Sequence, residues 1–400
     1  MSGCSVSGAS NVRRWVGYDE SHMTAFSRLA ILAAACWLAS GAAAYSAEKD
    51  EPVFPGADWE RVAKPESIGY SSAKLEALRG WLKTQQTTGM VVSVGGRILF
   101  EYGDIKYVST VASVRKSVLG MLYGKYVADG TIDLQKTVDV LGLDDVRKFL
   151  PREKDATLEM LLMSRSGVYL AEGEPDPDPT DDPPARGSQY PGNFFYYNNW
   201  DFNAAGTAFE KLTGQNIYDA LRKDLAEPIG MQDYNVELQK QREKSNMPYS
   251  VHREYKMYLS TRDMARLGLL MLREGQWNGK HLMPEHWNEF LTQLVTPSHD
   301  IFPVSLRDAV TVGPSRWGYG RMWWVWDQPK APGRLRVGDF YGAHTALGTG
   351  GQSITVLPVY DMVVAHKIEI EGASPGDMSL LEQSTILQMV IATRCNGACK

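Results

Sequence analysis

The chain of 400 residues lacks a long basic run, an internal repeat and, after its first 44 residues, a second segment typical of an export signal or a membrane span. Lys and Arg total 42 against 47 Asp and Glu, a net charge of −5, which argues against a nucleic-acid partner. Cysteine is scarce. Of the four cysteines, Cys395 and Cys399 lie near the C-terminus, and an oxidising compartment would allow them to pair.

Several catalytic motifs are missing as well. Ser113 lies between Val111 and Arg115 and not in the Gly-x-Ser-x-Gly of an α/β-hydrolase. The stretch at 281–286 has the wrong spacing for zinc and contains Pro284, and no Gly-Lys-[Ser/Thr] of a phosphate loop occurs. We therefore expect no metal ion and no organic cofactor.

The first 47 residues are typical of an export signal. A short segment ends in Arg28, an apolar stretch runs from 29 to 44, and the small residues Ala42, Ala43 and Ala44 offer a cleavage site. The alternative is a membrane anchor, for which sixteen alanine-rich residues are marginal. Residues 1–47 are thus predicted to be an N-terminal extension and signal peptide. The mature protein would be periplasmic or secreted, with no stable membrane span.

The sequence predicts that residues 48–400 form one domain of the α+β class, because strand patterns lie on both sides of a central stretch with helical patterns. The pattern predicts a sheet lobe at about 60–112 and 310–395 and an inserted, mostly helical lobe at about 113–309. Strands are expected at 90–94, 97–102, 317–326, 353–357 and 362–368. Helices are expected at 71–83, 113–128, 131–170, 201–230, 260–275 and 379–393.

Ser113-Val114-Arg115-Lys116 places a hydroxyl and an amine one turn apart where a helix begins. A lysine packed among apolar neighbours such as Val118 loses its proton more readily and can activate a serine nucleophile. This segment is the first candidate element of a catalytic site.

Two further elements offer partners. After Pro191-Gly192, a phenol and an amide spaced by one residue occur in two overlapping forms, Tyr196 with Asn198 or Tyr197 with Asn199, and the tyrosine could relay a proton. The run 346–352 is rich in glycine before a strand, which lets a substrate approach the backbone. The Thr349 and Ser113 N–H groups could then form an oxyanion hole.

The order Ser-x-x-Lys, Tyr-x-Asn and a glycine-rich strand resembles the serine β-lactamase and penicillin-binding-protein superfamily, and most of all its class C-related hydrolases, which include esterases, D-aminopeptidases and 6-aminohexanoate-dimer hydrolase. The resemblance covers about 60–395, with supporting stretches at 156–168, 225–231 and 260–268. It implies an antiparallel sheet flanked by helices. It also implies a serine hydrolase that cleaves an amide or ester through an acyl-enzyme on Ser113, with Lys116 and Tyr197 as base and proton relay.

The resemblance favours Tyr197, with Asn199 as its partner, and places Gly348 and Thr349 at the oxyanion site. True β-lactamases of this type carry Lys-Thr-Gly where this chain has Ala346-Leu347-Gly348, so we expect weak lactamase activity. His344, two residues upstream, could partly replace the missing basic group.

Other readings stay open. The enzyme could be a D-Ala-D-Ala carboxypeptidase or a class C-like β-lactamase, and a non-catalytic relative could bind peptidoglycan or a peptide in the same groove. The aromatic residues at 317–326 would pack the core or line a cleft for an acyl chain. The acidic, proline-rich loop at 172–187 would be a solvated connection or a lid. We expect a small-molecule amide or ester as substrate. The sequence leaves the acyl group, the leaving group and the oligomeric state open.

Overall fold

The computed structural model describes residues 52–173, 183–243, 248–327, 338–371, 376–395 and 399. The predicted signal segment at 1–47 and residues 174–182 of the acidic loop lie outside these ranges. Within them, no helix is both long and apolar enough to cross a membrane.

The described residues form a seven-stranded sheet in the order β2-β1-β11-β10-β9-β8-β7. Every neighbouring pair is antiparallel, which confirms the predicted α+β fold with its antiparallel sheet. The strands are β1 (Thr87–Val94), β2 (Arg97–Gly103), β7 (Trp317–Tyr319), β8 (Trp324–Trp326), β9 (His344–Gly348), β10 (Gln352–Leu357) and β11 (Met362–Ile368).

The strands β10 and β11 are buried along their whole length. A strand that is covered on both faces reads as a continuous apolar run and not as an alternating pattern. The segment 362–368 begins with such a run at Met362–Ala365, whereas 353–357 alternates between polar and apolar residues up to Val356. The structure places both at the centre of the sheet. β9 was not predicted as a strand, because its five residues include small and polar side chains as well as a glycine.

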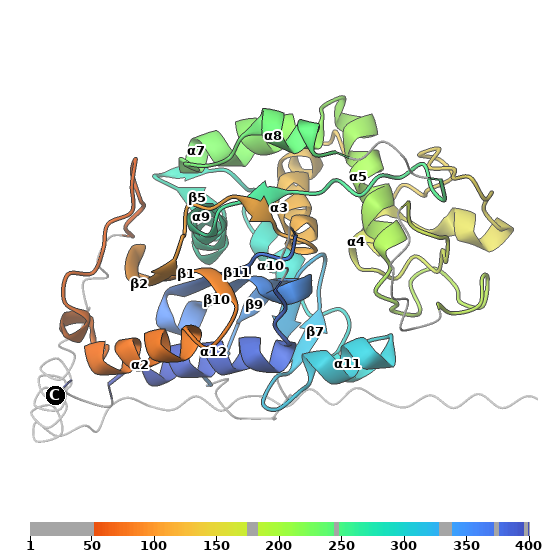
Figure 1. The fold of residues 1–400 in the computed structure, drawn as a ribbon. Helices are drawn as coiled ribbons and strands as arrows, with labels where there is room; N and C mark the ends of the chain where they lie inside the picture. Colours follow the sequence, from red (N-terminus) through yellow and green to blue (C-terminus); the bar gives the residue numbers. More distant parts are fainter. Residues whose placement is uncertain are drawn as a thin grey trace, which may run out of the picture. The chain divides into compact units, whose positions relative to one another are not determined.

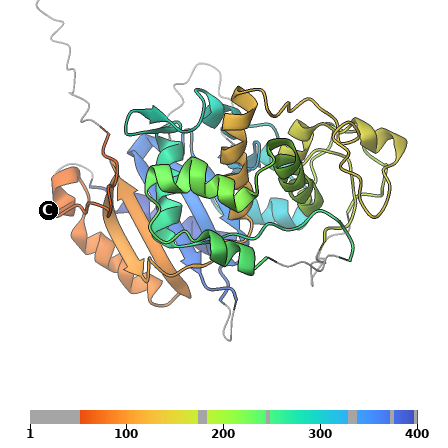
Figure 2. The same cartoon turned by 90° about the horizontal axis from the view of Figure 1, so that it is seen from above.

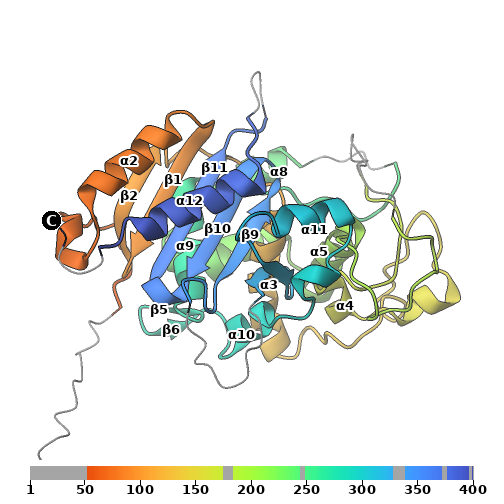
Figure 3. The same cartoon turned by 90° about the horizontal axis from the view of Figure 1, so that it is seen from below.

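Helices cover both faces of the sheet. α2 (Ser72–Leu82) and α12 (Leu380–Ala392) pack against each other along one face (Figure 3). α9 (Thr261–Leu272) and α3 (Val114–Ala128) lie against the other face (Figure 1). α3 is the helix that carries the Ser-x-x-Lys motif, so the motif begins at the boundary between the sheet and the remaining helices.

The middle of the chain supplies the remaining helices. Figure 2 shows the yellow part of the chain, near residue 150, on the side of the molecule away from the hairpin β1–β2. The helices are α4 (Leu158–Leu162), α5 (Asn199–Thr213), α6 (Ile217–Leu221), α7 (Glu227–Ile229), α8 (Val236–Gln241), α10 (Trp287–Thr292) and α11 (Val304–Val310), with a π-helical turn at Arg222–Ala226. A two-stranded sheet pairs β3 (Ser109–Thr110) with β4 (Tyr258–Leu259).

The expectation that 131–170 is helical was wrong for most of its length. Apart from a 3₁₀ turn at Pro151–Asp155 and the short helix α4, these residues form turns and extended segments. Asp133 and Asp145 accept hydrogen bonds from nearby backbone N–H groups, at Gln135 and Val146. Such local bonds stabilise turns in competition with helix.

Candidate active site

Ser113 lies at the N-terminal end of α3, three residues after β3. The Val111 N–H donates to the Met257 carbonyl at 2.9 Å, which continues the β3–β4 pairing toward the helix. Ala112 then has φ 45°, in the left-handed region that alanine rarely adopts. Such strain is typical of functional sites, where the surrounding structure holds a residue in an unfavourable conformation. Here it turns the chain sharply into the helix and leaves the serine at its first turn.

Lys116, one turn further on, places its amine within hydrogen-bond distance of three side chains. Nζ lies 2.9 Å from Ser113 Oγ, 3.0 Å from the Tyr197 hydroxyl and 2.6 Å from Asn199 Oδ1. The lysine is 1% exposed, and its Nζ lies 4.7 Å from the centroid of the Phe202 ring. Residues from two distant parts of the chain therefore meet at one buried nitrogen.

The surroundings of this nitrogen favour an uncharged amine. Burial lowers the pKa of Lys116 well below its usual value, because the ammonium loses its hydration. The Arg115 guanidinium lowers this pKa further, while Glu254 and Glu172 act in the opposite direction. Burial raises the pKa of Tyr197 to about 12, so the phenol keeps its proton at neutral pH.

Of the two overlapping Tyr-x-Asn pairs, Tyr197 and Asn199 reach the amine. Asn198 instead caps α5, where its side chain accepts a hydrogen bond from the Trp200 N–H at 3.2 Å. Tyr196 packs its ring edge-on against that of another tyrosine, with centroids 5.6 Å apart. The structure thus brings Tyr197 and Asn199, the pair that the family resemblance favoured, to the Lys116 amine, and the catalytic roles of both residues stay predictions.

The glycine-rich element is the end of β9 and the turn that follows it. A Cβ atom on Gly348 would lie 2.6 Å from the Val111 carbonyl oxygen, closer than any real side chain allows. Glycine therefore lets β9 come next to the segment that precedes Ser113. Thr349, the next residue, begins the turn beside it. The roles of Gly348 and Thr349 at an oxyanion site stay predictions.

His344 lies at the start of β9 and is buried. One ring nitrogen lies 3.1 Å from the Gly342 carbonyl oxygen, and the ring packs against Trp323 with centroids 5.4 Å apart. Burial lowers its pKa to about 4, so the ring is neutral at pH 7 and supplies no positive charge for a carboxylate. Among the described residues, no hydrogen bond joins it to the Ser113 group. The predicted binding role of His344 gains no support from this geometry.

Aromatic residues at 317–326 pack around the Tyr197 ring. Trp324 stacks on the Tyr197 ring with centroids 5.6 Å apart, and Tyr319 packs against it edge-on at 6.0 Å. Both residues are buried. Packing of this kind restricts the tyrosine ring to one position.

Sequence reasoning missed Arg115, which it treated as an unspecified position of the motif. Its side chain is 1% exposed, and its guanidinium donates to Asn203 Oδ1 at 2.9 Å. It also lies 3.5 Å from the Glu254 carboxylate and 4.5 Å from the centroid of the Tyr255 ring. The available signal was an arginine within a helix that is otherwise apolar on most sides, because such a charge needs a partner.

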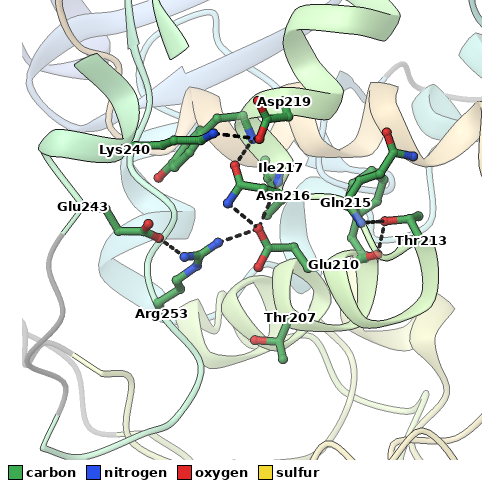
Figure 4. A network of polar contacts seen from close by, with 12 residues as sticks. Thr207, Glu210, Thr213, Gln215, Asn216, Ile217, Asp219, Lys240, Glu243 and Arg253 are labelled. Carbon is green, nitrogen blue, oxygen red and sulfur yellow. Dashed lines mark hydrogen bonds and ion pairs between the residues drawn. The ribbon is translucent and has the colours of Figure 1, made fainter. Parts of the chain in front are cut away.

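Sequence reasoning also missed Glu172, which precedes α5 in the chain, and Glu254, which follows it. The neighbour of Glu254, Arg253, forms ion pairs with Glu210 on α5 and with Glu243 after α8 (Figure 4). These pairs fix the segment that carries Glu254. Glu172 follows α4, and its carboxylate raises the pKa of Lys116.

Fold and site together define a class, the serine hydrolases in which a buried lysine adjoins the nucleophile. Residues 79–366 match the model of the Beta-lactamase family, and because this is most of the chain, the protein belongs to that family. It is a serine hydrolase of the β-lactamase and penicillin-binding-protein superfamily.

Individual relatives are distant. An uncharacterised protein of Alkalihalophilus pseudofirmus is 23% identical over 291 residues, which cover 66% of this chain and 75% of that protein. A candidate 6-aminohexanoate-dimer hydrolase of Bacillus anthracis has a TM-score of 0.56 at 19% identity, over 85% of this chain and 87% of that one. A candidate β-lactamase of Bacteroides dorei has a TM-score of 0.59 at 17% identity, over 81% and 99%. A family VIII carboxylesterase has a TM-score of 0.54 at 12% identity, over 84% and 99%. At these identities the solved structures establish the fold alone.

Proposed function

We propose that this protein is an exported hydrolase that cleaves an amide or ester bond through an acyl-enzyme on Ser113. One observation carries the proposal: the buried Lys116 amine lies within 3.0 Å of both the Ser113 and the Tyr197 hydroxyls. Such an arrangement can take a proton from the nucleophile and pass it to a leaving group.

The number of hydrogen-bonding directions on a neutral amine supports these roles. A neutral lysine amine has two N–H donors and one lone pair, and Nζ has three partners here. Asn199 Oδ1 accepts only, so it takes one N–H. If the second N–H points to Tyr197, the lone pair remains for the Ser113 proton. Serine attack then forms the acyl–oxygen bond as its proton moves to this amine.

The tyrosine completes the transfer. The Tyr197 pKa of about 12 keeps the phenol protonated, and the phenol oxygen lies 3.0 Å from the Lys116 amine. The phenol gives its proton to the leaving amine or alcohol as the acyl bond breaks, and regains one from Lys116. Water then attacks the acyl-enzyme by the reverse of this route. The Ser113 and Thr349 N–H groups would bind the negative oxygen of the tetrahedral intermediate.

The proposed substrate class follows from the charge of the residues at positions 344 and 346, on the strand β9. The position that is lysine in Lys-Thr-Gly is Ala346, a buried residue without charge. The neutral His344 does not replace that lysine. We therefore propose linear amides and esters as substrates in preference to β-lactams, whose carboxylate would find no cation at positions 344 and 346.

Labelling with a fluorophosphonate tests the chemistry. The wild type should be labelled and should hydrolyse p-nitrophenyl butyrate, and Ser113→Ala should lose both properties while it stays folded by circular dichroism. A folded wild type that is neither labelled nor active would point to a binding protein. Nitrocefin turnover equal to turnover of the ester would restore the β-lactamase reading. For export, expression in a Gram-negative host should yield a periplasmic protein whose N-terminus lies near residue 45.

A further inference from the structure

The backbone around Tyr197 is held on both of its edges. On one edge, the Ser164 hydroxyl donates to the Tyr196 carbonyl at 2.7 Å and accepts the Asn198 N–H at 2.9 Å. The Ser164 carbonyl also accepts the Tyr196 N–H at 3.1 Å. On the other edge, the Tyr197 N–H donates to the Phe302 carbonyl at 2.9 Å. Alternate residues of an extended chain bond to opposite edges, so this pattern fixes the course of the segment that carries Tyr197.

We propose that Ser164 is a positioning residue, which fixes the backbone on both sides of Tyr197 and so keeps the tyrosine hydroxyl beside the Lys116 amine. This inference rests on the proposed function, in which that hydroxyl passes a proton to the leaving group. A serine hydroxyl has one O–H donor and two acceptor lone pairs, so one side chain can hold a carbonyl and an N–H at once.

The conformation of Ser164 supports a role for its side chain. The residue follows the end of α4 and has φ 54°, in the left-handed region. The position after a helix is usually glycine when φ is positive, because a Cβ atom is unfavourable there. Serine therefore has a backbone cost that glycine would avoid, and it supplies a hydroxyl that glycine lacks. The residue is 1% exposed, so this hydroxyl bonds within the protein.

The turn that carries Ser164 is itself fixed to α5. Two residues further on, the Ser166 hydroxyl donates to Asp201 Oδ1, on that helix, at 2.5 Å. The Asn198 amide donates to the same oxygen at 3.0 Å. Ser166, Asp201 and Asn198 are all buried. The bonds from Ser164 therefore connect the segment around Tyr197 to a buried network that includes α5.

A small displacement would be enough to matter. The Tyr197 hydroxyl lies 3.0 Å from Lys116 Nζ, and a movement of about 1 Å would end that hydrogen bond. Misplacement on this scale can lower a rate by a factor of about 100. Without the Ser164 hydroxyl, the Asn198 N–H and the Tyr196 carbonyl lose the group that they share, and the segment can shift on that edge.

Ser164→Ala tests the inference, with Ser250→Ala as the matched control. Ser250 is also buried, and its hydroxyl likewise donates to one group, the Asp145 carboxylate, and accepts a backbone N–H, that of His252. Both variants should therefore have a lower denaturation midpoint than the wild type. Only Ser164→Ala should lower kcat on p-nitrophenyl butyrate, by about 10- to 100-fold per fluorophosphonate-labelled site. KM and the acid limb of the kcat/KM profile should stay as in the wild type, because no charge changes.

Two further variants separate the hydroxyl from the backbone conformation and from stability. Ser164→Gly suits the left-handed backbone and removes the hydroxyl, so its kcat should fall as that of Ser164→Ala does, and it serves if the alanine variant does not fold. In the Tyr197→Phe background, the further change Ser164→Ala should leave kcat unchanged, because no hydroxyl remains to be positioned. A wild-type kcat in either Ser164 variant, or a full additional loss in the Tyr197→Phe background, would overturn the inference while the hydrolase proposal stands. A wild type that neither labels nor turns over the ester would end both.

Discussion

At the scale of single residues, the central feature of the site is the number of hydrogen bonds that Lys116 Nζ can make. Lys116 Nζ has three neighbours in the directions that a neutral amine offers, and one of them, Asn199 Oδ1, is an obligatory acceptor. Adding a proton would remove the lone pair and leave Ser113 facing a donor. In the proposed mechanism, reactivity therefore depends on the charge of a single buried lysine.

Tyr197→Phe should lower kcat on p-nitrophenyl butyrate by about 10²- to 10⁴-fold, the usual contribution of a general acid or base. The substitution keeps the ring that Trp324 stacks on and removes the hydroxyl at 3.0 Å from the amine. Tyr196→Phe is the matched control, because it changes the same atom one residue earlier and should keep the wild-type rate. A wild-type rate in Tyr197→Phe would place the proton relay elsewhere.

The pH profile should report the charge of Lys116. Its amine must be neutral to accept the serine proton, so kcat/KM should fall about tenfold per pH unit below its pKa. Arg115→Met removes the positive charge that lowers this pKa and also removes one of the two ion-pair partners that Glu254 has among the described residues, the other being Lys256, so the acid limb should move to higher pH.

Arg115→Lys keeps a charge at this position and should move the acid limb less. The measurement is kcat/KM on the same ester from pH 4 to 9, after circular dichroism has shown that each variant is folded. An unchanged limb in Arg115→Met would mean that another group controls the rate.

The sequence predicts those residues of the candidate site that lie close together along the chain. Ser113 and Lys116 share one helical turn, so their spacing alone brings them together. Tyr197 was ambiguous by one position, although Asn198 is a typical helix N-cap residue and α5 begins directly after it. Glu172 could not be predicted, because it lies far along the chain from Lys116, whose pKa it raises, and only the folded chain brings the two near each other.

At the scale of elements, α3 must pack closely to hold the motif. Trp287 on α10 lies across it, and its indole N–H donates to the Gly120 carbonyl at 3.0 Å. A Cβ on Gly124 would lie 2.6 Å from the nearest ring atom of this tryptophan. Glycine at 124 therefore lets the two helices approach, at the expense of backbone entropy in α3.

Gly124→Ala should lower the free energy of unfolding by about 1–3 kcal/mol, because the added methyl group forces the indole aside. Gly80→Ala is the control. Gly80 lies within α2, and an added Cβ there meets no atom within 4 Å. This change should raise stability by about 0.5–1 kcal/mol through helix propensity. Denaturant unfolding measures both, and a stabilised Gly124→Ala would mean that α10 adjusts without cost.

Elements were predictable where their apolar pattern is long. The helix expected at 260–275 is α9, and that expected at 379–393 is α12, each behind a serine N-cap. The helix prediction for 131–170 was wrong, because the apolar side chains of this segment are buried while the backbone forms mostly turns and extended segments and not a continuous helix. The helix expected at 201–230 is interrupted at Gly214, whose φ of 66° ends α5.

At the scale of the whole molecule, a second buried lysine joins the sheet to the segment that precedes Ser113. Lys367, on β11, donates hydrogen bonds to the Ser109 carbonyl on β3 at 3.0 Å and to the Leu259 carbonyl on β4. Burial lowers its pKa to about 7. The Lys367 side chain, whose pKa lies near neutral pH, thus connects the two-stranded sheet before Ser113 to the central strands.

The stability of the protein should therefore depend on pH in a window set by Lys367. The unfolded chain holds this proton up to a pKa of about 10.4 and the folded chain only up to about 7, so the free energy of unfolding should rise with pH between the two. Lys367→Met removes that rise and leaves two carbonyls without a donor, so it should be less stable than wild type at pH 9.5 by about 2–4 kcal/mol. Toward pH 7 the difference should shrink, because the wild type loses the stability that deprotonation of Lys367 adds. Denaturant unfolding of both proteins at pH 7 and 9.5 gives the four values needed, and a difference that does not change with pH would show that Lys367 keeps its proton in the folded state.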